Sequence, residues 1–135
     1  MREQSTFCGA ADGGVRNLLR VEGLVLLICA AALYERSSGD WKLFAILFLV
    51  PDFSFAFYLA GPRIGALGYN AMHSTLGPLA LGAAGIAWNL HLAAIIGLIW
   101  LAHVGFDRAL GYGLKHTRGF GFTHLGRIGR TAKES

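Results

Sequence analysis

Four long apolar runs constrain this chain more than any other feature of its sequence. They lie at about residues 15–34, 41–60, 64–88 and 89–110, separated by short turns. At ~1.5 Å per residue, each run is long enough as an α-helix to cross a hydrocarbon core of about 30 Å. Only 15% of the 135 residues are charged, whereas a soluble domain usually carries about 25%. We therefore predict an all-α fold, an integral membrane four-helix transmembrane bundle.

The basic residues are unevenly distributed among the predicted loops. If both termini are cytoplasmic, ten of the 12 Lys and Arg face the cytoplasm, and only Arg36 and Lys42 face outward. The positive-inside rule favours this arrangement. We expect a multi-pass protein of the cell inner (cytoplasmic) membrane, N-in and C-in, with the lipid bilayer as its partner. No basic stripe is interleaved with aromatic residues, so we expect no nucleic-acid partner.

The same pattern divides the chain into three parts. Residues 1–14 are predicted to be a flexible cytoplasmic tail, residues 15–110 the transmembrane domain, and residues 111–135 a Gly-rich basic cytoplasmic tail. Pro51 removes one helix hydrogen bond in the second run and frees a carbonyl. The third run is rich in small residues, so we expect it to be the most enclosed helix, with a bend at Pro78.

Ionisable side chains inside the apolar runs are the candidate functional residues. His103 and Asp107 are four residues apart, a spacing that places both on one face of a helix. Counted from the cytoplasmic ends of their runs, Glu22, Asp52 and His73 lie at comparable depths, on the order of 6–14 Å. Such groups are costly in a bilayer unless they meet a partner, an ion or water. We expect all five to converge in the cytoplasmic half.

A metal site is the first of three interpretations of this layer. His73, His103, Asp107 and Asp52 are its candidate ligands, with Asp52 as the fourth ligand or the catalytic general base. Imidazole nitrogen and carboxylate oxygen suit Zn, Mn or Fe, and Zn or Mn is the candidate cofactor. A metal-bound water is a nucleophile for hydrolysis.

The second interpretation is an accessory or structural membrane protein whose polar layer only fixes helix packing. The third is a proton or small-solute conduit formed in a homo-oligomer. The residues alone leave open which of the three applies, and whether the protein is an enzyme. Further polar residues belong to the same layer or lie at its edge: Glu22, Tyr69, Asn70 and Arg108.

Eight short motifs, in order along the chain, resemble those of one family. They are Leu19–Gly23 (LRVEG), Pro51–Ser54 (PDFS), Gly61–Arg63 (GPR), Tyr69–His73 (YNAMH), Gly77–Pro78, Ala102–Arg108 (AHVGFDR), Gly111–Lys115 (GYGLK) and Gly121–Gly126 (GFTHLG). Over about residues 18–126 the chain resembles the small bacterial membrane proteins catalogued as domain of unknown function 4260. This resemblance implies a four-helix membrane protein and supplies no activity.

The chain also has a fainter similarity to membrane-bound metal-dependent hydrolases of the inner-membrane type. That family carries a Pro-Asp-x-Asp segment, a His-containing helix start, and a later His-x-x-x-Asp followed by glycine. Asp52, His73, His103 and Asp107 match these positions in order, which implies the same four metal ligands. Residue 54 is Ser where that family has its second Asp, and the His73 segment lacks that family's additional histidine.

Overall fold

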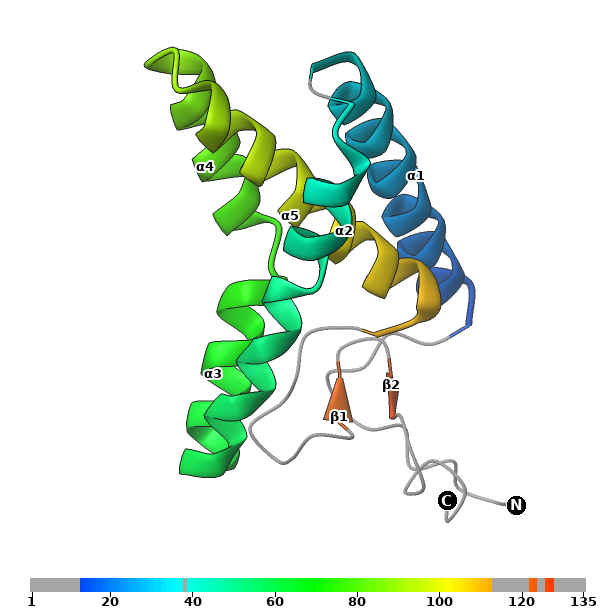
Figure 1. Ribbon diagram of the computed structural model, residues 1–135. Coiled ribbons are helices and arrows are strands. Elements are labelled where there is room, and N and C mark those ends of the chain that lie inside the picture. Colours follow the sequence, from blue (N-terminus) through cyan, green and yellow to red (C-terminus); the bar gives the residue numbers. More distant parts are fainter. Residues whose placement is uncertain (1–12, 38, 113–121, 124–125, 128–135) are drawn as a thin grey trace, which may run out of the picture.

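The computed structural model describes residues 13–37, 39–112, 122–123 and 126–127, and most of these residues are helical (Figure 1). The predicted tails, 1–14 and 111–135, lie almost entirely outside these residues. The elements in chain order are α1 (Gly13–Ser37), α2 (Trp41–Phe48), a 3₁₀ helix η1 (Val50–Ala60), α3 (Pro62–His73), α4 (Leu76–Ala87), α5 (His91–Leu110), and strands β1 (Phe122–Thr123) and β2 (Gly126–Arg127). The strands pair antiparallel, with Phe122 opposite Arg127.

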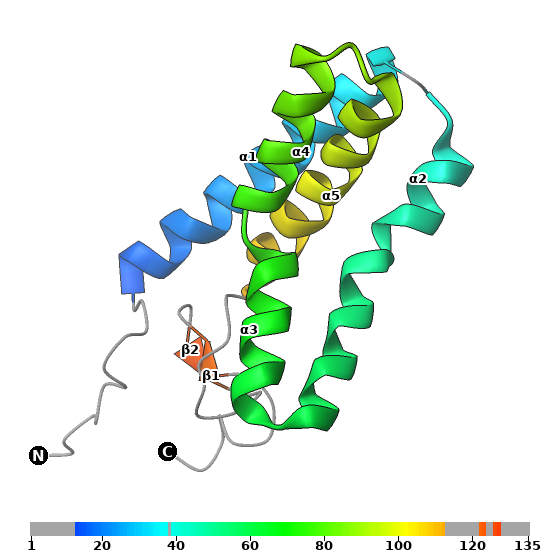
Figure 2. The ribbon, with the colours of Figure 1, turned by 90° about the vertical axis from the view of Figure 1, so that its left-hand side faces the viewer.

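Among the described residues, three segments are long and apolar enough to cross a membrane: α1, α2 together with η1, and α5. The start of α1, the turn at Gly61 and the end of α5 lie toward one end of the molecule, and the other two turns lie at the opposite end (Figures 1 and 2). The lengths and compositions of these helices fit a membrane protein.

The third apolar run, predicted as one helix over 64–88, is divided into α3 and α4. The break falls at Ser74, whose ψ of 157° is extended, and not at Pro78. A proline cannot donate a hydrogen bond to the carbonyl four residues earlier, and its ring clashes with that carbonyl. Pro78 therefore interrupts the helix at Ser74 and itself fits into the first turn of α4, which is where a proline is tolerated.

Helix α1 crosses α5 with the two backbones in direct contact. A Cβ added at Gly23 would lie 2.8 Å from the carbonyl oxygen of Gly105, and one added at Gly105 would lie 2.7 Å from the backbone nitrogen of Leu27. Glycine at both positions permits this approach, as small residues do between membrane helices. Because Gly105 lies between His103 and Asp107, the same contact fixes the part of α5 that carries them.

The most buried of the three long segments is α5, which also packs against α4. The expectation that the third run would be the most enclosed is therefore wrong. Its half α4 leaves Leu76 and Ile86 largely exposed, although α3 does bury four of its residues. The small residues of α3 have another use, because Gly65 and Gly68 lie against the rings of Tyr58 and Phe57 of η1.

Together η1 and α3 form a helical hairpin that packs chiefly on itself and extends past the end of α5 (Figures 1 and 2). Helix η1 is unusually long, since 3₁₀ helices rarely exceed 3–4 residues. The hairpin joins the remaining helices at two places, Leu49 and the Ser74–Thr75 break. Both joints lie beside residues of the polar layer, Asp52 and His73.

Replacing Gly105 with alanine should separate α1 from α5. The added methyl meets backbone atoms of α1, which cannot move aside locally, so we expect a loss of about 1–3 kcal/mol, typical of overpacking. Thermal unfolding in detergent measures it. Gly82→Ala is the matched control, because a Cβ at Gly82 has nothing within 4 Å. Equal melting temperatures for the two variants would contradict the close crossing.

Candidate metal centre

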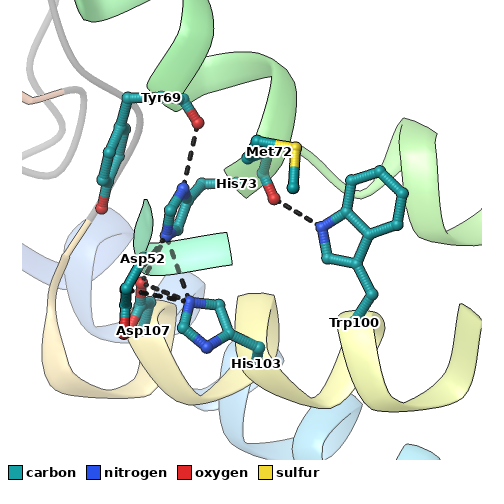
Figure 3. A network of polar contacts seen from close by, with 7 residues as sticks. All are labelled: Asp52, Tyr69, Met72, His73, Trp100, His103 and Asp107. Carbon is teal, nitrogen blue, oxygen red and sulfur yellow. Dashed lines mark hydrogen bonds and ion pairs between the residues drawn. The ribbon is translucent and has the colours of Figure 1, made fainter. Parts of the chain in front are cut away.

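Four ionisable side chains from three helices meet at the base of the hairpin (Figure 3). Asp52 lies in the first turn of η1, His73 is the last residue of α3, and His103 and Asp107 lie one turn apart on α5. One nitrogen or oxygen atom from each lies within 4.8 Å of the other three. The sequence-based expectation that these four would converge is confirmed, and ligation of a metal by them stays a prediction.

The distances between these atoms suit a small divalent cation. His73 Nε2 lies 3.1 Å from both His103 Nε2 and Asp107 Oδ2. His103 Nε2 lies 3.3 Å from Asp107 Oδ2 and 3.3 Å from Asp52 Oδ1, which lies 3.6 Å from His73 Nε2. Zinc bonds of ~2.0–2.1 Å put tetrahedral ligand atoms about 3.3–3.4 Å apart. These five distances lie around this value, and the remaining one, between the two carboxylates, is within 4.8 Å.

The ring of His73 is held in the orientation and tautomer that a metal ligand needs. Its Nδ1 donates a hydrogen bond of 3.0 Å to the carbonyl oxygen of Tyr69, one helical turn earlier. Because a carbonyl only accepts, Nδ1 carries the proton and a neutral ring directs its Nε2 lone pair into the cluster. The Tyr69 ring stacks on the imidazole with centroids 3.8 Å apart and planes within 7°. Backbone carbonyls are frequent partners of metal-binding histidines.

The charges of the cluster require a positive counterpart. Asp107 is 15% exposed and the two imidazoles are 1–3% exposed, so the acid and its neighbours are poorly solvated. Within the described residues, both carboxylates make ion-pair contacts with the histidines and none with lysine or arginine. Two carboxylates and two neutral imidazoles carry a charge of −2, which one divalent cation neutralises. Protonated histidines are the other source of positive charge.

Phe48 of α2 lies against the side of His103 that faces away from the cluster. The Nδ1 of His103 has no hydrogen-bond partner at good geometry within the part of the chain that the structure describes, although the main chain of Phe48 lies beside it. The Phe48 ring contacts the imidazole edge at a centroid distance of 5.0 Å. In a 3₁₀ pattern the Phe48 carbonyl would accept from residue 51, which is proline and has no N–H. The carbonyl freed by Pro51 therefore lies next to the cluster.

Comparison with known proteins gives one family. The model described as Domain of unknown function (DUF4260) matches residues 16–128. The chain belongs to the DUF4260 family. No curated protein and no solved structure matches it. The resemblance inferred from the eight motifs is thus confirmed, whereas the fainter similarity to membrane-bound hydrolases stays a prediction.

The other polar residues singled out in the sequence of this DUF4260 chain do not contribute ligand atoms to the cluster. Tyr69 orients His73 through its carbonyl and ring, and the Asn70 carbonyl accepts from the Ser74 N–H at 2.9 Å where α3 ends. Glu22 lies exposed on α1 and interacts electrostatically with Arg108. Glu22 therefore does not join the cluster. Two residues at the same depth in two helices meet only if both lie on the faces that point toward each other.

Trp100, which sequence reasoning did not single out, supports the site. Trp100 donates from Nε1 to the carbonyl oxygen of Met72 at 2.6 Å (Figure 3). That carbonyl lacks a helical partner because the helix breaks after His73. The indole has room because Gly77 has no Cβ, which would lie 2.5 Å from the ring. In the sequence, Pro78 indicates this arrangement, because a proline leaves the backbone about four residues earlier without its helical hydrogen bond.

Trp100→Phe should loosen the end of α3 that carries His73. It leaves the Met72 carbonyl without its donor inside an apolar region, a loss of about 1–3 kcal/mol. We expect a lower melting temperature in detergent, measured beside Trp88→Phe, whose indole is 71% exposed. A melting temperature equal to that of Trp88→Phe would show that the bond does not hold the helix end.

Proposed function

We propose that this protein is a membrane-embedded metalloprotein whose His73, His103 and Asp107 bind a divalent cation, Zn or Mn, for hydrolytic chemistry. One observation carries the proposal. Four electron-pair donors, two of them carboxylates, lie 3.1–3.6 Å apart along five edges with no lysine or arginine pairing them among the described residues. Such an arrangement in a bilayer is stabilised by a cation in its centre.

Three of the four candidate ligands lie close to one another and are buried, whereas the fourth lies farther away and is more exposed. His73, His103 and Asp107 are mutually within 3.1–3.3 Å and at most 15% exposed. The Asp52 side chain is 42% exposed and lies 3.6 Å from His73. Catalytic zinc sites commonly have three protein ligands and one open position. This division supports the closer three as ligands and Asp52 as the residue beside the open position.

A divalent cation in this site supplies Lewis acidity and lowers the pKa of a coordinated water. Asp52 is then placed to accept a proton from water and return it to the departing oxygen. The reaction adds one water across an ester or phosphoester bond, so that an acid and an alcohol are formed. No redox partner is required for this chemistry.

A purely structural network is less well supported, because such a network needs a well-aligned partner for each buried polar atom, whereas His103 Nδ1 meets the main chain of Phe48 without good hydrogen-bond geometry among the described residues. A conduit formed in a homo-oligomer needs a polar path into the other half of the molecule. There the polar residues of the described chain, among them Asp40, Asn89 and His91, lie exposed at the turns. These two alternatives explain less of the observed geometry.

We further propose that the chain crosses the inner membrane four times, N-in and C-in. Helices α3 and α4 have 12 residues each, so each is ~18 Å long and too short to cross alone. Stacked end to end, they form a discontinuous fourth crossing. Irregular backbone at membrane depth is tolerated where protein covers it or where it lines a cavity, and Trp100 covers this break.

The proposed metal site predicts about one equivalent of metal per chain in detergent-purified protein, measured by elemental analysis after incubation with Zn or Mn. His73→Ala, His103→Ala and Asp107→Asn should each lose it, whereas Asp52→Asn should retain most of it with weaker binding. His91→Ala and Glu22→Gln are matched controls outside the cluster and should retain it fully. Wild-type protein without metal would overturn the proposal, and so would equal loss in the control variants.

The proposed topology predicts which turns face outward. In a chain whose Cys8 and Cys29 are replaced by alanine, a cysteine at Ser37 should react with a membrane-impermeant maleimide in intact bacterial cells. A cysteine at Arg63 should react only after the membrane is permeabilised. The reverse pattern would invert the topology, and labelling of both in intact cells would exclude the fourfold crossing.

A further inference from the structure

An apolar cavity of about 200 Å³ lies directly beside the four-residue cluster. It is separate from the polar atoms of the cluster, and the proposed hydrolytic chemistry does not account for it. The residues lining it include Leu47, Pro51, Met72, Leu81, Ile96 and Trp100.

Three of the residues that line the cavity lie close in sequence to residues of the cluster. Pro51 directly precedes Asp52, and Met72 directly precedes His73. Trp100 lies three residues before His103 on α5, which is nearly one helical turn. The cavity is thus bounded by residues that belong to the same helical turns as Asp52, His73 and His103.

The chemistry of the walls excludes a polar occupant. The lining side chains are aliphatic apart from Met72 and Trp100, and the only N–H among them, on the Trp100 indole, is already donated to the Met72 carbonyl. A polar group placed here would lose its hydration and gain no hydrogen bond. Hydrocarbon is the material that such a cavity accepts.

The cavity also lies on a side of the molecule that lipid chains can approach. Its walls come from α2 and α4 on either side of α5, and α5 lies between these two helices in both views (Figures 1 and 2). In a bilayer, the side between α2 and α4 faces lipid. A chain can reach the cavity laterally from the membrane.

We propose that this cavity binds the hydrocarbon chain of a lipidic substrate whose ester or phosphoester group lies at the metal cluster. The position of the ester or phosphoester group rests on the proposed function, whereas binding of the hydrocarbon chain does not depend on it. An engineered cavity of about 150 Å³ binds benzene, so 200 Å³ accommodates roughly eight carbon atoms. The remainder of a longer chain extends into the bilayer.

The first experiment measures how chain length affects binding to the Zn-loaded protein in detergent. The probes are acetohydroxamate and octanohydroxamate, which share a metal-chelating head and differ in the chain. Leu81→Trp fills the cavity from α4, which carries no ligand. Leu79→Trp is the control, because Leu79 is 52% exposed and does not line the cavity.

We expect Leu81→Trp to weaken octanohydroxamate binding by about tenfold, or ~1.4 kcal/mol. Acetohydroxamate binding and metal content should change less than about twofold, on the same scale. Leu79→Trp should bind both probes as wild type does. Equal octanohydroxamate affinity in all three proteins would overturn the inference. Ile96→Phe repeats the test from α5 if Leu81→Trp does not fold.

The second experiment does not need a metal. Octanoic acid with a diazirine near the end of its chain is photolysed with the purified protein, and the labelled peptides are identified by mass spectrometry. We expect label at Met72, Leu81 or Ile96 in wild type and its loss in Leu81→Trp. No label at these residues in wild type would overturn the chain-binding cavity. If these residues are labelled but the protein binds no metal, the cavity is supported and only the proposed function is overturned.

Discussion

The polar cluster is the constraint on which the other parts of this structure depend. Two carboxylates and two imidazoles from three helices meet within 4.8 Å in a chain that is otherwise almost uncharged between Leu43 and Phe106. In a low-dielectric setting the cost of burying one charge is several kcal/mol. The helices must therefore be arranged so that each of these groups finds the others. The glycine contact between α1 and α5 and the break after His73 both serve this arrangement.

The break in the third apolar run is the second feature that determines the site. A continuous helix would use the Met72 carbonyl in its own hydrogen bonding and would leave no place for the Trp100 indole. Pro78 prevents that continuation, and Gly77 gives the indole its space. Metal-binding or substrate-binding residues of membrane proteins are often found beside such interrupted helices. His73 is the last residue before such an interruption.

Sequence reasoning predicted the helical fold and the meeting of Asp52, His73, His103 and Asp107. It succeeded because the apolar runs show where each helix begins. The constant rise per residue of a helix then gives the depth of each polar residue from its position in the run. It failed for Glu22, because depth gives no information on which side of α1 faces the cluster. It also located the irregularity at Pro78 itself, although proline acts on the carbonyl four residues earlier. Trp100 was missed because an indole in an apolar helix is usually only a packing residue.

The attachment of the η1–α3 hairpin has a mechanical consequence. Within the described residues, the hairpin packs chiefly on itself and is joined to the other helices at Leu49, at Ser74–Thr75, through the cluster and by the Trp100–Met72 hydrogen bond. The first two are chain connections that lie between helices, Leu49 between α2 and η1 and Ser74–Thr75 between α3 and α4. Two such joints define an axis, and a body held on one axis still has freedom to swing. The side-chain contacts of the cluster and the Trp100–Met72 hydrogen bond supply attachment away from this axis, so that the same side chains also set the angle between the hairpin and α5.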